Sequence, residues 1–399
     1  MAGITGMGTT FSLPNYAGEL FAITPSSTPL LSAIGGLTGG GQTTGVEFEW
    51  QTSDLRDPAQ RTKVEGAAAP TAEARVRANV RNVVQIHQEK VEVSYTKQAA
   101  FGQLQTPGAA PFRSVDGSNP VTNELDWQIA EALKSVALDV NFSFINGTHA
   151  NPTTNGTARR TRGLLQAITT NRIAAGTSVT GATSATTVIT SAGHGLANGD
   201  RIVFTDTSTA TGIVAGRVYY VVSAATDTFG VASSAGGAAI TLGTATGLAF
   251  TEPSATALTT DQVGDLMQMV YDNGGITEQE TATLLVNSTQ KRALTHAYAD
   301  AYGKFQETSR TIGGVSVDTI LTDFGTLNVM LDRHVPQDVI IVSSLEQLMP
   351  VFMNIPGKGV FFEEELAKTG ASDAVQLYGE IGLKYGNERA HGVLTGLAV

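Results

Sequence analysis

The sequence contains no cysteine, and its charged residues are sparse. Without cysteine the chain can form no disulfide framework, no Cys-ligated zinc site and no thiol nucleophile. Charged residues make up 15% of the 399 residues, below the roughly 25% of an average soluble protein. Glycine, alanine and threonine take their place. This composition is typical of a protein rich in β-turns, or of one that buries much of its surface in an assembly.

Long apolar runs and an excess of positive charge are also missing. No apolar run approaches the roughly 20 residues that span a bilayer, so we expect no membrane partner. Residues Met1–Gly6 lack the basic and apolar regions of a secretion signal, which favours synthesis in the cytoplasm. The net charge of −11 argues against tight wrapping of DNA, because wrapping requires a basic stripe that displaces counterions.

The motifs of the common enzyme classes are absent as well. The six histidines are scattered, with no helical zinc spacing and no HExxH motif. The glycine cluster at 35–41 is not followed by the lysine of a phosphate-binding loop, and no GxSxG or GxGxxG motif occurs. The acidic run Glu363–Glu365 is more typical of a salt-bridged face than of acid–base catalysis. We therefore predict a non-enzymatic protein without catalytic residues, cofactor or metal.

The length predicts roughly two or three domains, and the hydrophobic content of 41% is sufficient for packed cores. The first segment, residues 1–45, is rich in glycine, threonine, serine and proline. Its Thr24-Pro25 and Thr28-Pro29 pairs disfavour a continuous helix, because a residue before proline is pushed out of the α region. The glycine-rich stretch 35–45 should be flexible or follow the contour of a neighbour. We therefore interpret residues 1–45 as an arm and not as a domain.

Residues 46–97 are predicted to form a long hairpin that projects from the body. Val46, Phe48 and Trp50 alternate with glutamates, which is the period of a β-strand, and a second strand is expected over 83–96. The polar connection between them is too long for a structureless loop inside a compact domain. Residues 46–100 contain eight acidic and eight basic residues, and this balance favours salt bridges over phosphate contacts. The candidates for contacts between subunits are Arg56, Asp57, Arg61, Lys63, Glu65, Arg75, Arg77 and Arg81.

The strongest helix pattern covers residues 119–146. Asn119 is a suitable N-cap, Pro120 suits the first helical position, and Gly147 suits the position after the end. Apolar residues recur at spacings of three or four, so they form one stripe along the helix. The predicted core of this spine helix is Leu125, Ile129, Leu133, Val136, Val140 and Phe144.

Residues 177–253 differ from the rest in composition and are predicted to be a compact all-β insertion. Only six of them are charged. Short β runs at 201–204, 218–222 and 239–242 are separated by turn residues at a spacing typical of sandwiches and barrels. Tyr219, Tyr220 and Phe229 would suit a sugar-binding platform, but packing in a core is the commoner use of aromatic residues.

Helical and strand patterns alternate in the remainder of the chain, so the predicted fold class is α+β. Helices are expected over 258–271 and 289–302. Strands are expected over 282–286, 315–321, 327–331, 339–342 and 375–385.

An arm, a charged hairpin, a long helix and a terminal sheet, in that order, resemble the major capsid protein of tailed phages, which has the Hong Kong 97-type fold. The resemblance covers everything except the insertion, and the order of its motifs is the specific feature. The stretches that carry it are Leu20–Pro25 with Thr28–Leu31, Phe48–Gln51 with Arg56–Pro58 and Glu65-Gly66, and Glu365–Gly370 with Gly379-Glu380 and Asn387–Gly392.

The resemblance implies a division of the chain into the domains of that fold. These are an N-terminal arm (1–45), an extended E-loop hairpin (46–100), a peripheral (P) domain (101–154), the start of an axial (A) domain (155–176), the insertion (177–253), the A domain with the return to the P domain (254–345) and C-terminal P-domain strands (346–399).

The resemblance also implies partners and a location. The chain would assemble in the bacterial cytoplasm as hexamers and pentamers, and the resulting icosahedral head of the virion would enclose double-stranded DNA without sequence-specific contacts. The expected partners are further copies of the chain, the portal, and a separate scaffold or cement protein.

The insertion and one lysine leave alternatives open. The insertion resembles a small β module of phage virion and tail proteins, which implies clamping between neighbours or weak glycan binding. An alternative function is therefore a tail or adhesin protein that binds host glycan. A glycan-degrading virion enzyme is a third, although no pair of carboxylates suggests it. Some capsid relatives are cross-linked by a Lys–Asn isopeptide bond, but the spacing identifies no partner for Lys63, which we expect to be an ordinary surface charge.

Overall fold

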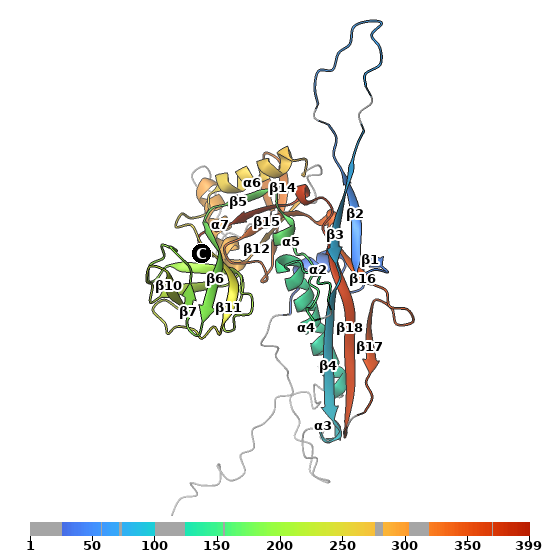
Figure 1. Cartoon of the computed structure of the whole chain (residues 1–399), viewed down its shortest axis with the longest axis vertical. Helices are drawn as coiled ribbons and strands as arrows, with labels where there is room; N and C mark the ends of the chain where they lie inside the picture. Colours follow the sequence, from blue (N-terminus) through green and yellow to red (C-terminus); the bar gives the residue numbers. More distant parts are fainter. Residues whose placement is uncertain are drawn as a thin grey trace, which may run out of the picture.

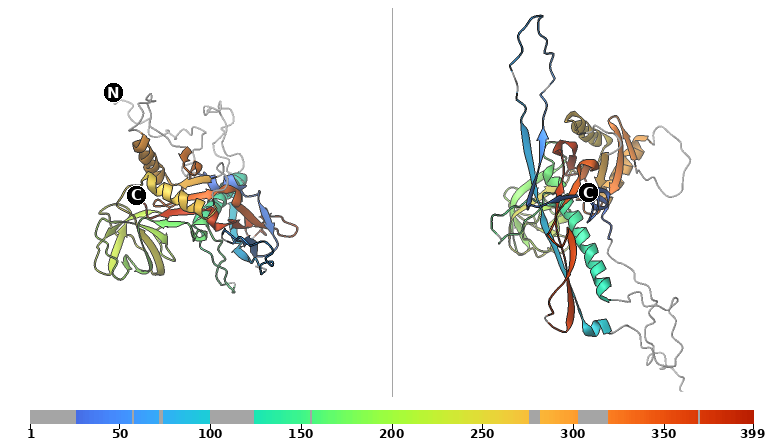
Figure 2. Two further views of the ribbon diagram at one scale, coloured as in Figure 1. Left: turned by 90° about the horizontal axis from the view of Figure 1, so that it is seen from above. Right: turned by 90° about the vertical axis from the view of Figure 1, so that its right-hand side faces the viewer.

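The computed structural model describes residues 26–56, 58–71, 74–99, 124–154, 156–275, 282–302, 319–368 and 370–399. The described part of the chain is elongated. A hairpin projects from one end, a long helix lies along a sheet toward the other end, and a second sheet and a barrel lie to one side (Figure 1 and Figure 2). The α+β fold class is confirmed.

The first sheet is organised around its longest strand, β18 (Ser372–Lys384). One edge of β18 pairs antiparallel with β4 (Gln85–Ser94). The other edge pairs with β16 (Met349–Met353) and β17 (Phe361–Glu365). β1 (Gly41–Thr43) extends the sheet in parallel to β16. The alternating pattern predicted near the end of the sequence therefore belongs to the central strand.

Helix α4 (Glu124–Asn146) lies along this sheet and contacts both β4 and β18 (Figure 1). The expected cap, Asn119-Pro120, lies outside the described residues. Val136, Val140 and Phe144 are at most 3% exposed and belong to the main core. The earlier part of the predicted stripe, Leu125 and Ile129, is partly buried against a smaller apolar cluster on the sheet.

Leu133 does not belong to this core, contrary to the prediction, because its side chain is 39% exposed. An α-helix turns by about 100° per residue, so a run of residues spaced by four drifts away from a straight face. Ala132, which is 5% exposed, takes the place against the sheet. The change from a spacing of four to a spacing of three after Ile129 keeps the stripe on the sheet.

The second sheet has the strand order β13-β14-β12-β15-β19-β5. Its strands are β5 (Arg172–Ala174), β12 (Ala282–Val286), β13 (Thr319–Thr322), β14 (Gly325–Leu331), β15 (Ile340–Ser344) and β19 (Gly392–Thr395). Helix α6 (Thr260–Asp272) packs against β19, and α7 (Ser288–Tyr302) contacts β12. The strand predicted over 282–286 and both predicted helices are confirmed. Residues 315–318 of the strand expected over 315–321 lie outside the described residues.

Between β5 and α6 the chain forms a closed barrel with the strand order β10-β7-β6-β11-β8-β9. Its strands are β6 (Thr177–Ala185), β7 (Val188–Thr190), β8 (Arg201–Asp206), β9 (Val218–Val222), β10 (Thr228–Ala232) and β11 (Ala245–Glu252). Phe250 makes edge-to-face contacts with Phe204 and Phe229 in the barrel core. Tyr219 is 5% exposed and belongs to the same core, so the interpretation of Tyr219 and Phe229 as packing residues is confirmed.

The strand predicted over 239–242 does not form. The N–H of Ile240 donates to the carbonyl of Val231, and the N–H of Leu242 donates to that of Thr186. The Leu242 carbonyl accepts from Thr211. Because these bonds reach three different segments, they cannot form one ladder. The segment contributes the fully buried side chain of Leu242 to the barrel core.

The projecting hairpin consists of β2 (Glu47–Ser53) and β3 (Arg77–Val83), and residues between them extend beyond the strands (Figure 1). The prediction that a strand over 83–96 pairs with β2 is wrong, because β4 pairs with β18. Val83 and Val84 are both fully buried where the chain passes from the hairpin into the sheet. Two consecutive buried residues break the alternation on which the prediction depended.

Part of the expected arm is packed into the body. Helix α2 (Pro29–Ile34) begins with proline at its first position, where the missing N–H has no consequence. Leu30 and Leu31 are at most 2% exposed and belong to the main core. Residues 1–25 lie outside the described residues. The remaining short elements are α3 (Tyr95–Ala99), α5 (Leu164–Ala167), η1 (Leu345–Gln347) and η2 (Glu388–Ala390). In the described ranges, no helix has the length and apolar character of a membrane span.

A buried polar cluster joins α2, α4 and the end of β14. Asn141 is fully buried, and its Oδ1 accepts a hydrogen bond from the Leu31 N–H at 2.9 Å. Its Nδ2 donates to Asp332 Oδ2 at 2.9 Å and lies 2.7 Å from His334 Nδ1. Burial raises the pKa of Asp332, but hydrogen bonds from His334 and Asn141 outweigh this effect and lower it. The carboxylate is therefore held in its ionised form.

Substitutions on α4 test which of its faces is buried. Phe144→Ala removes a fully buried ring, so the free energy of unfolding should fall by about 3–5 kcal/mol. Leu133→Ala on the same helix should lower it by less than about 1.5 kcal/mol, because that side chain is already partly solvated. Urea unfolding of the unassembled full chain measures both values. Equal losses in the two variants would contradict the assigned face.

Candidate functional site at the base and tip of the hairpin

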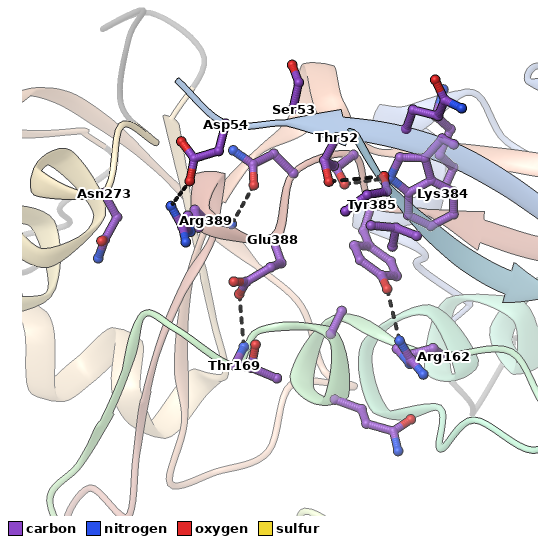
Figure 3. Close-up of a pocket in the computed structure, with 18 of the residues that line it drawn as sticks. Thr52, Ser53, Asp54, Arg162, Thr169, Asn273, Lys384, Tyr385, Glu388 and Arg389 are labelled. Atoms are coloured by element: carbon purple, nitrogen blue, oxygen red, sulfur yellow. Dashed lines mark hydrogen bonds and ion pairs between the residues drawn. The ribbon is translucent and has the colours of Figure 1, made fainter. Parts of the chain in front are cut away.

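An open cleft with a volume of about 1020 Å³ lies where the hairpin meets the body (Figure 3). It is lined by both hairpin strands, by residues 162–169 around α5 and by residues 384–389 after β18. The sequence motifs at 48–51 and 387–392 therefore meet at this place, although they are more than 300 residues apart. In the part of the chain that the structure describes, no group of three or more acidic or histidine side chains could hold a metal ion.

Trp50 fixes the base of the hairpin to the body. Its Nε1–H donates to the carbonyl of Gly386 at 2.7 Å. Its ring packs edge-on against Tyr385, with a centroid distance of 4.9 Å, and stacks with Phe48 at 6.0 Å. A two-stranded hairpin is marginally stable by itself, so this contact sets the direction in which the hairpin leaves the body.

Asn82 makes a second anchor at the end of β3. The side chain is fully buried, and its Nδ2 donates to the Leu383 carbonyl at 2.7 Å. Its Oδ1 accepts from the backbone N–H groups of Arg162 at 2.8 Å and Val83 at 2.9 Å. Arg162 in turn donates from Nη1 to the Tyr385 hydroxyl at 3.1 Å (Figure 3). Hydrogen bonds thus join the hairpin, the segment before α5 and the end of β18.

Glu388 and Arg389 close the opposite wall of the cleft (Figure 3). The Glu388 carboxylate accepts from the N–H groups of Thr169 and Thr170, each at 3.1 Å. Burial raises the pKa of Glu388, but these hydrogen bonds outweigh it and lower the pKa. Arg389 pairs with Asp54 of the hairpin at 3.4 Å. Because both side chains of this pair are well exposed, it contributes little to stability.

His391 completes the junction below the cleft. Its Nδ1 accepts from the Ser344 N–H at 3.3 Å and lies 2.9 Å from Ser343 Oγ. Its Nε2 lies 2.9 Å from the Tyr385 carbonyl, so the ring is neutral with its proton on Nε2. Burial lowers the pKa of His391 to about 4, against opposing effects of the Tyr385 carbonyl and Glu388.

The predicted contact residues are distributed along the hairpin, away from the cleft. Arg56, Arg61, Lys63, Glu65, Arg75 and Arg77 are exposed on or beside its outer part, and Asp57 lies outside the described residues. Arg81 lies nearer the base, where it forms an ion pair with Glu47 of the facing strand at 3.3 Å. Part of the expected charge pairing therefore takes place within the hairpin itself.

The hairpin tip, defined as the described residues between 55 and 76 beyond the two strands, contains apolar residues that the sequence interpretation missed. One of these residues, Val76 at the inner end of the tip, also lines the cleft. Leu55, Val64 and Val76 are 84%, 81% and 81% exposed, which are the highest values among the large apolar side chains of the described residues. These residues show no helical or strand periodicity, and charged residues surround them in the sequence. The one signal that could have identified them is the presence of apolar residues in an otherwise polar connection.

The neutral state of His391 predicts a pH dependence of stability. In the unfolded chain the imidazole binds a proton below its ordinary pKa of 6.5, whereas in the fold it does so only near pH 4. Stability is therefore complete above pH 6.5 and is lost as the pH falls toward 4. The buried imidazole of His87, whose pKa burial also lowers to about 4, acts in the same direction. We expect a combined loss on the order of several kcal/mol.

Urea unfolding of the unassembled chain at a series of pH values measures this loss. His391→Gln is the matched variant, because an amide can both accept and donate at this position but does not titrate in this range. The variant should show a shallower decrease in stability between pH 6.5 and about 4 than the wild type. An unchanged slope would show that His391 is not buried in its neutral form.

Comparisons with known proteins agree with this architecture. The family model of the SU10 major capsid protein matches residues 3–398. No curated protein matches the sequence. The capsid protein in the asymmetric unit of cyanophage A-1(L) is similar in structure, with a TM-score of 0.55 and 12% identity over 99% of both chains. The capsid protein of cyanophage P-SCSP1u has a TM-score of 0.49 and 10% identity, over 96% of this chain and 93% of that chain.

At 12% identity the structure from cyanophage A-1(L) shows the fold alone, and the family model shows the family. The first sheet with its long helix, the second sheet with its helices and the projecting hairpin form the Hong Kong 97-type arrangement of phage capsids. The chain thus belongs to the SU10 major capsid protein family and is the major capsid protein of a tailed phage.

Proposed function

We propose that this chain forms hexamers and pentamers of an icosahedral head, in which each hairpin lies on an adjacent subunit. The hairpin formed by β2 and β3, with the residues between them, corresponds to the E-loop in this proposal. The sheet around β18 with α4 corresponds to the P domain, the sheet around β12 to the A domain, and the barrel to an insertion in the A domain. Residues 1–45 would complete the shell as an arm.

The observation that best supports this proposal is a contrast within the hairpin, whose base is bonded to the body while its tip is exposed. The base is held by Trp50 and Asn82 through short hydrogen bonds to the body. The tip presents the highly exposed Leu55, Val64 and Val76. Full burial of each of these side chains would contribute about 1.5–3 kcal/mol of favourable free energy, which is absent while they contact water. A hairpin that is fixed at its base and apolar at its tip is suited to burial against a second copy of the chain.

The charged residues around this tip suit a role in positioning. We propose Arg56, Asp57, Arg61, Lys63, Glu65, Arg75, Arg77 and Arg81 as residues that contact neighbouring subunits. Exposed ion pairs at the rim of an interface contribute little affinity, but they select the register and orientation of the partner. In this proposal the apolar side chains provide the binding energy, and the surrounding charges determine where the hairpin settles.

The remaining partners follow from the role as a shell subunit. The net charge of −11 would limit adhesion of packaged double-stranded DNA to the inner wall. The portal and a separate scaffold or cement protein would act with the chain during assembly in the bacterial cytoplasm. Its role would be structural and would involve no catalysis. The alternative of a glycan-binding adhesin has no support, and Tyr219 and Phe229 are buried in the barrel core instead of forming a sugar platform.

Substitutions at the hairpin tip test this proposal. The variant Leu55→Ser/Val64→Ser/Val76→Ser should fold with the wild-type unfolding midpoint, because these side chains contact water in the isolated subunit. Its assembly into closed shells should require at least about tenfold more protein, since roughly 1.4 kcal/mol of lost contact energy corresponds to a factor of ten. Sedimentation velocity with electron microscopy of the fastest species measures assembly.

The matched control is Val188→Ser/Val214→Ser on the barrel, where the side chains are 42% and 48% exposed. It removes apolar groups of the same kind from a surface outside the proposed contact, so shells should form at the wild-type concentration. Normal assembly of the tip variant, or an equal defect in the barrel variant, would contradict the role of the hairpin tip.

A further inference from the structure

The joint between the barrel and the body is closely packed. Where the chain enters the barrel, the Ala175 N–H donates to the Thr395 carbonyl at 2.7 Å. Where it leaves, the Ser254 N–H donates to the Gly396 carbonyl at 2.8 Å. A Cβ atom added to Gly396 would lie 2.4 Å from the Gly176 nitrogen, so no side chain fits between these segments. Both connections therefore pack against the last residue of β19 and the glycine that follows it.

A third contact comes from the turn at residues 336–339 of the body. The Gln337 N–H donates to the Gly216 carbonyl at 3.0 Å, and its Oε1 accepts from the Val218 N–H at 3.1 Å. Gly216 has a φ of +77° and lies against Pro336, where a Cβ atom would come within 3.2 Å. The turn thus holds the connection between β8 and β9, at a position that favours glycine.

The carboxylate of the next residue in this turn, Asp338, is buried. The residue is 1% exposed, and neither carboxylate oxygen has a hydrogen-bond partner of good geometry among the described residues. Gln290 of α7, which bonds to the adjacent residue Gln337, is also fully buried. The Gln290 Nε2 donates to the carbonyls of Gln337 at 2.7 Å and Ala398 at 2.9 Å, which leaves its Oε1 unpartnered within the described ranges. Three buried acceptor oxygens at this joint therefore lack a donor.

We propose that this cluster binds a proton on Asp338, and that the bound proton fixes the barrel to the body. A buried carboxylate without a partner is unfavourable, because it loses its hydration and gains no compensating charge or donor. A single proton removes the charge and supplies an O–H donor at a place where three buried acceptor oxygens lack a well-placed one. A metal ion is a poorer fit, because the described residues offer no group of three or more acidic or histidine ligands.

The surroundings of Asp338 contain no charge that stabilises the ionised form. Burial raises the pKa of Asp338 to about 6, and only the backbone N–H groups of Asp338 and Gly396 oppose this effect. The elements around it carry Arg217, Glu252, Lys291, Arg292 and Arg333, and none of these shifts its pKa. The proton therefore comes from solution and is not exchanged with a neighbouring side chain.

The direction of the pH effect follows from the two states. The carboxyl has an ordinary pKa of 3.8 in the unfolded chain and about 6 in the fold. Protonation therefore adds stability as the pH falls from about 6 toward 4, and above 6 the carboxylate weakens the joint. This effect is opposite to that of His391, and it is local to the barrel junction.

Hydrogen exchange of the full chain, followed by mass spectrometry and corrected for intrinsic rates, tests the proposal at about pH 7.5 and about pH 5. In the wild type, protection of residues 214–218 should rise by on the order of tenfold or more at the lower pH. Asp338→Asn carries an uncharged donor of the same shape, so it should show the higher protection at both pH values. Asp338→Ser, also neutral with a donor, should lack the pH dependence even if its overall stability is lower.

The control is Asp332→Asn, which changes another fully buried carboxylate, one that already has partners. It should leave the pH dependence at residues 214–218 intact. The same pH dependence in the wild type and Asp338→Asn would overturn the proposal, as would an equal change in the peptides of α4. Restoration of protection at about pH 7.5 by Ca²⁺, reversed by a chelator, would assign the cluster to a cation instead.

Discussion

The arrangement of the body depends on the buried amide of Asn141. It connects the backbone of α2, the middle of α4 and the carboxylate of Asp332 at the end of β14. Apolar contacts alone tolerate small shifts between elements, whereas a buried amide with directional partners does not. Replacing it would leave the Leu31 N–H without an acceptor and the Asp332 carboxylate with one donor fewer, both at buried positions. The two sheets are thus held in one relative position, from which the hairpin and the barrel extend.

Two buried carboxylates on one short segment show how the surroundings decide their ionisation. Asp332 and Asp338 are each at most 1% exposed and six residues apart. Asp332 has donors from His334 and Asn141, so its pKa is lowered, whereas Asp338 has none of good geometry, so its pKa is raised. The first therefore fixes a permanent joint within the body, and the second makes the joint to the barrel responsive to pH. In the proposed shell, a subunit with a rigid body and a barrel that responds to pH would adjust the barrel without disturbing the contacts of the hairpin.

The periodicity of apolar residues correctly predicted those helices and strands in which burial follows a regular spacing along the chain. The apolar run 282–286, the helix over 258–271 and the alternation around β18 all appear in the structure, because burial on one or both faces leaves a periodic signal. The incorrect predictions concern segments where tertiary contacts, and not the local spacing of apolar residues, determine the structure. Leu30 and Leu31 look like part of a polar arm, yet they fill the main core. The partner of β2 could not be identified, because Val83-Val84 marks a change of sheet that no alternation records.

At the candidate site, too, local features could be predicted from the sequence, whereas contacts between distant segments could not. The charges of the hairpin were evident from the sequence, but their spacing could not reveal that Trp50 would bond to Gly386, more than 300 residues away. That bond matters because a shell needs lateral contacts that are weak singly and numerous together. Many such contacts formed in parallel give a stable particle, while each remains reversible enough for a misplaced subunit to leave. A rigid base keeps the entropy lost on docking small. In the proposed shell, the exposed apolar side chains of the hairpin would bind the neighbour with modest energy, and the charges around them would disfavour the wrong registers.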